Sequence, residues 1–97
     1  MTVTVDHSLP KDIARERVAK LLSDSVREYG HLISDHTFKW GDNTCELKLT
    51  VKNFDVMGNI EIKSKEVVVQ TKVPLILQGF KSRIKHIISG ELERVLR

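Results

Sequence analysis

The sequence predicts an α+β fold, in which a five-stranded antiparallel sheet carries two helices on one face, in the order β-α-β-β-β-β-α. Apolar residues recur at three- and four-residue steps in two segments and alternate with polar residues in five others. Short turn sequences separate the later extended segments, so consecutive strands should be antiparallel. The 97 residues suffice for a single domain, 1–97, but not for two.

The first strand and the first helix adjoin near the start of the chain. Val3 and Val5 alternate with polar neighbours, which predicts a short strand with one buried face. Ser8 is the expected N-cap of the helix, and Pro10 belongs to its first turn. The helix should end near Gly30, and its apolar stripe is Ala14, Val18, Leu21, Leu22, Ser25, Val26 and Tyr29.

From Asp35 onward the period of the apolar pattern changes from 3.6 to 2. Phe38 and Trp40 share one face of an extended segment, and Gly41-Asp42-Asn43 follows as a turn that tolerates positive φ. These residues predict a hairpin. The inward face of the next strand consists of Cys45, Leu47, Leu49 and Val51.

The middle of the chain leaves two alternatives open. Phe54 and Val56 are even-numbered, so either a bulge lies near Asn53 or the strand ends there. Met57-Gly58-Asn59 is expected to form the next turn. The later inward positions are Ile60, Ile62, Val67, Val69, Thr71 and Val73.

Pro74 should end the last strand, because proline cannot donate to a ladder of hydrogen bonds. Leu75 to Gly79 then leads into the second helix, whose apolar stripe is Phe80, Ile84, Ile87, Ile88, Leu92 and Val95. Both helices are needed across the sheet, because otherwise one apolar face would remain in water.

Composition and motifs exclude several classes of function. A net charge of +3, without aromatic residues among the basic ones, does not indicate nucleic-acid binding. Cys45, the single cysteine, should be buried and inert, and it fits a cytoplasmic protein without disulfides. No targeting segment or membrane-spanning run is evident. His31 and His36 are best explained as solvated residues, so we expect no metal, no cofactor and no catalytic residue.

Glu91 departs from its local pattern, because at 100° per residue it points into the apolar arc of the second helix. We favour a residue at the rim of the core that reaches solvent. The alternative is a polar group of a small ligand pocket, together with Tyr29 and Trp40.

Basic residues concentrate toward the C-terminal side. Between Lys63 and Lys85, six basic residues and one acidic residue give a local charge of +5, which leaves −2 for the rest of the chain. A basic helix after an apolar segment suits an anionic or hydrophobic surface, although simple packing on the sheet explains the pattern as well. The candidate contact residues are Leu75, Leu77, Lys81, Arg83 and Lys85.

Several short motifs carry a family resemblance through their order and spacing. They are His7-Ser8-Leu9, a helix with Ala14 that ends in Tyr29-Gly30, Trp40 before Gly41-Asp42, Gly58, and Phe80-Lys81-Ser82-Arg83-Ile84 with Leu92. Together they resemble the polyhydroxyalkanoic acid system protein family, small bacterial proteins encoded beside genes for polyester storage granules. The resemblance implies a noncatalytic accessory protein that binds the granule surface or a granule protein.

Two other interpretations remain open. The element order is loosely similar to that of helix-grip domains, which implies a small hydrophobic ligand-binding protein or enzyme with Tyr29, Trp40 and Glu91 around its cavity. A homodimer is the other interpretation, in which an edge strand from Val67 to Val73 pairs with its copy.

Overall fold

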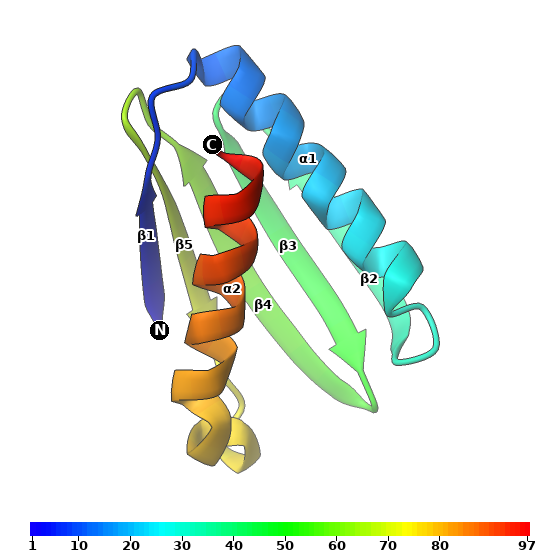
Figure 1. Cartoon of the computed structure of the whole chain (residues 1–97). Helices are drawn as coiled ribbons and strands as arrows, with labels where there is room; N and C mark the ends of the chain where they lie inside the picture. The colour runs from blue at the N-terminus through cyan, green and yellow to red at the C-terminus, as the bar shows by residue number, and fades with distance from the viewer.

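The computed structural model describes residues 1–97. Its elements are β1 (Thr2–Asp6), α1 (Lys11–Glu28), β2 (Ile33–Trp40), β3 (Thr44–Val51), β4 (Phe54–Ile62), β5 (Glu66–Lys72), the 3₁₀ helix η1 (Leu75–Phe80) and α2 (Lys81–Val95). The predicted α+β class, the five-stranded antiparallel sheet and the element order are confirmed. Both helices cross the same face of the sheet (Figure 1).

The strands are arranged in the order β1-β5-β4-β3-β2, and every neighbouring pair is antiparallel. Because β5 pairs with β1 on one side and β4 on the other, it is not an edge strand. The prediction of a dimer through Val67 to Val73 is therefore wrong, since the backbone groups of this segment are already paired within the chain.

The change of parity at Asn53 marks a turn. Lys52 and Asn53 both have positive φ, 48° and 71°, which is the backbone of a two-residue hairpin that matches the twist of its strands. β3 therefore ends at Val51, as one of the two alternatives predicted. The expected turn at Met57-Gly58-Asn59 is wrong, because these residues lie inside β4 and pair on both sides.

The start of α1 also differs from the prediction. Pro10 occupies the N-cap position, and Ser8 is exposed and makes no capping hydrogen bond. His7 organises this connection instead: its Nδ1 accepts a hydrogen bond from the Leu9 N–H at 3.1 Å, and its Nε2 lies 2.9 Å from the Lys63 carbonyl oxygen. The imidazole thus ties the β1–α1 connection to the chain at Lys63, and these contacts satisfy both of its ring nitrogens although it is buried.

The core lies at one end of the sheet. Its 11 buried residues are Val3, Val5, Ala14, Val18, Cys45, Ile60, Ile62, Val67, Val69, Leu92 and Leu96. At this end the two helices are tied together, because Arg17 Nη1 donates to the carbonyl oxygens of Val95 and Arg97 at 3.2 and 2.7 Å. Toward the other end the helices diverge (Figure 1).

The burial of the inward residues decreases from one cross-strand row to the next as the helices diverge. The row through Cys45, Ile60 and Val69 is buried. The next row runs through Leu47, Gly58 and Thr71, and its members are only partly covered. Beyond it, the same face of the sheet has apolar side chains that neither helix covers fully, so an opening remains between the helices.

Candidate apolar binding cleft

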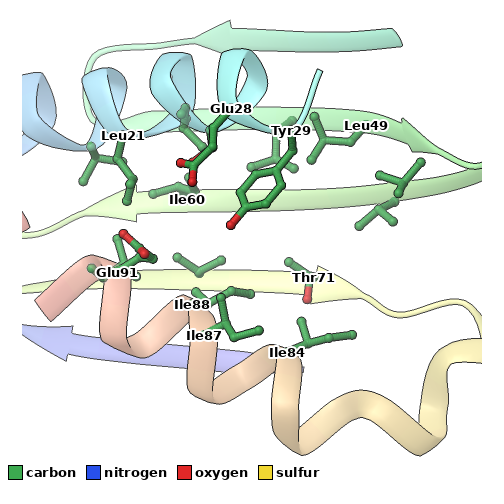
Figure 2. A pocket seen from close by; sticks show the side chains of 18 of the residues that line it. Leu21, Glu28, Tyr29, Leu49, Ile60, Thr71, Ile84, Ile87, Ile88 and Glu91 are labelled. Carbon is green, nitrogen blue, oxygen red and sulfur yellow. The ribbon is translucent and has the colours of Figure 1, made fainter. Parts of the chain in front are cut away.

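An apolar cleft of about 500 Å³ lies between α1 and α2, and β3, β4 and β5 form its floor (Figure 2). Of its 23 lining residues, 16 are hydrophobic, which is the composition of a site for an apolar ligand. The floor consists of Leu47, Leu49, Val51, Val56, Ile60, Val69, Thr71 and Val73. The walls include Leu21 and Leu22 of α1, Ile84, Ile87 and Ile88 of α2, and Pro74 and Leu77 near η1.

Gly58 helps to keep the floor of this cleft low. It lies between Val56 and Ile60 on the helix-facing side of β4 and pairs with Leu47 and Thr71. A residue with a side chain at this position would fill the middle of the floor. The glycine is also required by packing, because an added Cβ would lie 2.9 Å from the Gln70 carbonyl oxygen.

The charged groups of the cleft are mostly acidic. Asp24 and Glu28 belong to the α1 wall, and Glu91 and Arg94 to the α2 wall. The single guanidinium is already engaged, since Arg94 Nη2 lies 2.6 Å from Glu91 Oε2. This hydrogen bond raises the pKa of Arg94 above its usual value. With three carboxylates and one guanidinium, the lining has a formal charge of −2.

Asp24 lines the cleft, but the cations that pair with it lie outside the cleft. Lys20 Nζ donates to it at 2.7 Å, which lowers the pKa of Asp24, and Arg27 lies 3.5 Å away. Glu28 has no cation within 4.0 Å, and its carboxylate points from α1 into the cleft (Figure 2). Acidic charge therefore persists on the α1 wall.

Two hydroxyl groups are placed to recognise a polar atom in the cleft. The Thr71 hydroxyl is buried and has no hydrogen-bond partner. Figure 2 shows its oxygen pointing from β5 toward the side of Ile84, and the Tyr29 phenol reaching from α1 toward α2. A buried hydroxyl without a partner is uncommon in folded proteins, and a ligand atom would reach this one only after a neighbouring side chain has moved.

The structure brings together two of the three residues expected to form a pocket. Tyr29 and Glu91 line the cleft from opposite walls. Glu91 is about half exposed at the rim, where it pairs with Arg94. Trp40 is not part of the lining, because it lies in the row of Cys45, where Arg15 covers its ring with Cζ 4.6 Å from the centroid. Trp40 fluorescence is therefore not a reporter of the cleft.

The candidate contact residues lie in η1 and in the first turns of α2, and of the five only Leu77 lines the cleft. Leu75 in η1 is 89% exposed, whereas Leu77 turns inward and lines the cleft. Lys81, Arg83 and Lys85 are exposed on α2.

The apolar stripe predicted for the second helix is wrong at Phe80 and Ile87, which are exposed, and the exposure of Ile76 in the segment before that helix was not predicted. Ile76 and Phe80 of η1 and Ile87 of α2 are exposed apolar residues, with 66%, 54% and 55% of their surface accessible. The run of three apolar residues from Leu75 to Leu77 was the available signal, since a short helix cannot bury consecutive side chains on one face. The acidic wall had a similar signal, because Asp24 and Glu28 are four residues apart.

The remaining candidates for chemistry are placed away from the cleft or are inert. His31 and His36 are exposed, and no group of three or more His, Cys, Asp or Glu side chains is arranged to hold a metal ion. Cys45 is buried, and this burial raises the pKa of its thiol above the usual value. None of the helices is both long and apolar enough to cross a membrane.

The fold and the site define a small α+β protein with an apolar, acid-rimmed cleft. The chain belongs to the family described as "Putative polyhydroxyalkanoic acid system protein" (PHA_gran_rgn), whose family model matches residues 1–96. The expected family is thereby confirmed, and the chain is a protein of the polyhydroxyalkanoate storage system. No curated protein and no solved structure matches it, so the likeness to helix-grip domains stays a prediction.

Proposed function

We propose that this chain is a noncatalytic accessory protein that binds the surface of polyhydroxyalkanoate granules in the cytoplasm. The observation that carries the proposal is a cluster of exposed apolar side chains beside the cleft: Leu75, Ile76, Phe80 and Ile87, here called the apolar mouth. Leu77 lies within η1 and Ile87 on α2, and both line the cleft, so the mouth continues into it.

An exposed apolar cluster of this kind costs free energy in water, and it is a common feature of surfaces that bind a partner. Burial of one large aliphatic or aromatic side chain contributes about 1.5–3 kcal/mol. A polyester surface presents methyl and methylene groups that are able to cover such side chains. The mouth therefore supports association with the polymer without a catalytic step.

The charges near the mouth support the same orientation. Lys81, Arg83 and Lys85 follow η1 directly and are exposed on α2. Cations beside an apolar segment favour binding at an interface that has anionic groups. We propose that the apolar mouth enters the surface and that these three residues contact its charged groups.

Binding to the surface is tested by sedimentation of the protein with polyhydroxybutyrate particles. The variant Leu75→Asn/Ile76→Asn/Phe80→Asn changes only exposed residues, so it should fold and should be retained at least about tenfold less. Met57→Asn is the matched control, since Met57 is 55% exposed and lies in β4, paired with Lys48 and Lys72. Equal retention of both variants would refute the proposal.

The contribution of charge is tested separately. Reversing Lys81, Arg83 and Lys85 to Glu should weaken retention at low ionic strength, and the difference should shrink at about 1 M salt because the Debye length falls to about 3 Å. Lys48→Glu, on an exposed position of β3, is the control. Unchanged retention after the triple reversal would remove the basic residues from the contact surface.

A further inference from the structure

We infer that the cleft binds an uncharged segment of the polyester, a few ester units long, and discriminates against the free acid. This inference rests on the proposed function for the chemistry of the ligand. The selectivity for the neutral form comes from the charges of the cleft, whereas its size and one unpaired hydroxyl group suit the polyester chain.

The size and lining of the cleft suit an aliphatic chain. A volume of about 500 Å³ is within the range of small-molecule sites and leaves room for several repeating units. The floor and walls are aliphatic, with Leu47, Leu49 and Val56 on the sheet and Ile84 and Ile88 on α2. Methyl and methylene groups of a polyester would be removed from water along this whole surface.

The charged groups of the cleft should make its affinity higher for a neutral ester than for an ionised acid. An ionised ligand would meet the carboxylate of Glu28, which lines the α1 wall and has no cation within 4.0 Å. It would find no free cation among the lining residues, because Arg94 is paired with Glu91, and Lys20 and Arg27 lie beside Asp24. Transfer of a carboxylate to such a site is unfavourable, whereas an ester has no charge to desolvate.

The hydroxyl of Thr71 supplies a polar contact for an ester. Its oxygen is buried, has no partner, and points toward the side of Ile84 (Figure 2). Because the oxygen has no accessible surface, the Ile84 side chain would have to move before an ester carbonyl enters, and the carbonyl would then accept a hydrogen bond from this hydroxyl. The bond would satisfy the group that the free protein leaves unpaired, which favours the bound state.

The inference is tested by a methyl NMR titration of the whole chain. The probe is a trimer of 3-hydroxybutyrate with an acetyl group at one end and a methyl ester at the other. The methyl signals of Leu77, Ile84 and Ile88 should shift, and those of Met57 and Val68, which lie outside the lining, should not. Absence of shifts at the cleft, or formation of a dimer that covers it, would overturn the inference.

The same trimer with a free carboxyl group measures the selectivity. At pH 7 it should bind about threefold to fivefold more weakly, since the unpaired carboxylate of Glu28 contributes up to about 1 kcal/mol. Glu28→Gln should narrow this difference, because it should raise the affinity for the free acid more than the affinity for the capped trimer. Glu16→Gln, at an exposed position of α1, is the control and should change neither value. Equal or tighter binding of the acid by the wild-type chain would overturn the inference.

Thr71→Val separates a binding role from a structural one. The two side chains have nearly the same shape, and the variant removes the unpaired hydroxyl. Affinity for the capped trimer should fall about fivefold, while thermal stability should stay the same or rise. Unchanged affinity would overturn the role of Thr71. If the protein is retained on particles but does not bind the trimer, this inference alone is overturned. If it binds the trimer but the substitutions in the apolar mouth leave retention on particles unchanged, the proposed function alone is overturned.

Discussion

Thr71 faces Gly58 across neighbouring strands, and a Cβ added to Gly58 would lie 3.0 Å from the Thr71 Cγ2 atom. The methyl group of Thr71 therefore occupies the space that the glycine leaves. This close fit explains why a residue without a side chain stands in the middle of β4, although glycine weakens most strands. Because the methyl group of Thr71 packs over Gly58 in the floor of the cleft, the hydroxyl group of the same side chain points away from Gly58.

Gly58→Ala is expected to destabilise the fold by about 1–3 kcal/mol, because its Cβ would collide with the backbone of Gln70 and with Thr71. Gly90→Ala is the matched control in α2, where an added Cβ meets no atom within 4 Å. It should stabilise the chain by about 0.5–1 kcal/mol through helix propensity. Urea unfolding measures both, and changes of the same sign would contradict the account.

Arg17→Ala is expected to loosen the closed end of the helix pair. The variant loses two hydrogen bonds to the last residues of the chain, at Val95 and Arg97. The loss of unfolding free energy should be about 1 kcal/mol, because the guanidinium is exposed to water. Amide hydrogen exchange should accelerate at the end of α2 and stay unchanged in β5. Lys11→Ala, at an exposed position of the first turn of α1, should have little effect on either measurement.

The Cys45 thiol should resist alkylation in the folded protein. Burial raises its pKa, so the reactive thiolate is scarce at pH 8 and the sulfur is also shielded. In urea, iodoacetamide should react at the rate of an ordinary thiol. Fast alkylation without denaturant would show that the strand face around Cys45 is open.

The raised pKa of the Cys45 thiol should make the free energy of unfolding depend on pH in the alkaline range. The thiol stays protonated in the folded state at pH values where the unfolded chain, with its usual pKa of 9.0, has lost the proton. The free energy of unfolding should therefore be unaffected by Cys45 below pH 9.0 and should fall above it. Cys45→Ala should reduce this alkaline loss, and an identical pH profile in both proteins would contradict the assignment.

Arg15→Gln should lower stability by about 0.5–1 kcal/mol, because the guanidinium stacks on the indole ring of Trp40. The fluorescence of Trp40 should change as well, since its nearest cation is removed. Unchanged emission would contradict the observed stacking. In the wild-type chain the emission should stay constant when the capped trimer enters the cleft, because Trp40 lies outside it.

Periodicity predicted most of the fold. The alternation of Val67, Val69 and Thr71 with their neighbours predicted that these three residues face inward, and the structure confirms it. The prediction succeeded because the alternation with period two is regular in this strand. The change of parity at Asn53 left a bulge and a strand end as alternatives, and the hairpin turn was not recognised because Lys52-Asn53 has no glycine, although asparagine tolerates positive φ. Gly58 looked like a turn residue because sequence alone does not distinguish positive φ from close packing.

The cleft was only partly predictable. The stripe of α1 placed Tyr29 toward the sheet, and helix geometry placed Glu91 toward the apolar arc. The divergence of the helices, by contrast, depends on tertiary contacts such as the one between Arg17 and Arg97, which no local pattern encodes. The empty hydrogen-bonding position of Thr71 is likewise a result of packing, so its importance appeared only in three dimensions.

In the proposed function, the apolar mouth and the cleft form one continuous site for polyester. The most direct test measures how much protein is released from polyhydroxybutyrate particles as capped trimer is added. We expect release over the same range of trimer concentration in which the methyl signals of Ile84 and Ile88 shift. Full retention on the particles at a trimer concentration that saturates the cleft would contradict the claim.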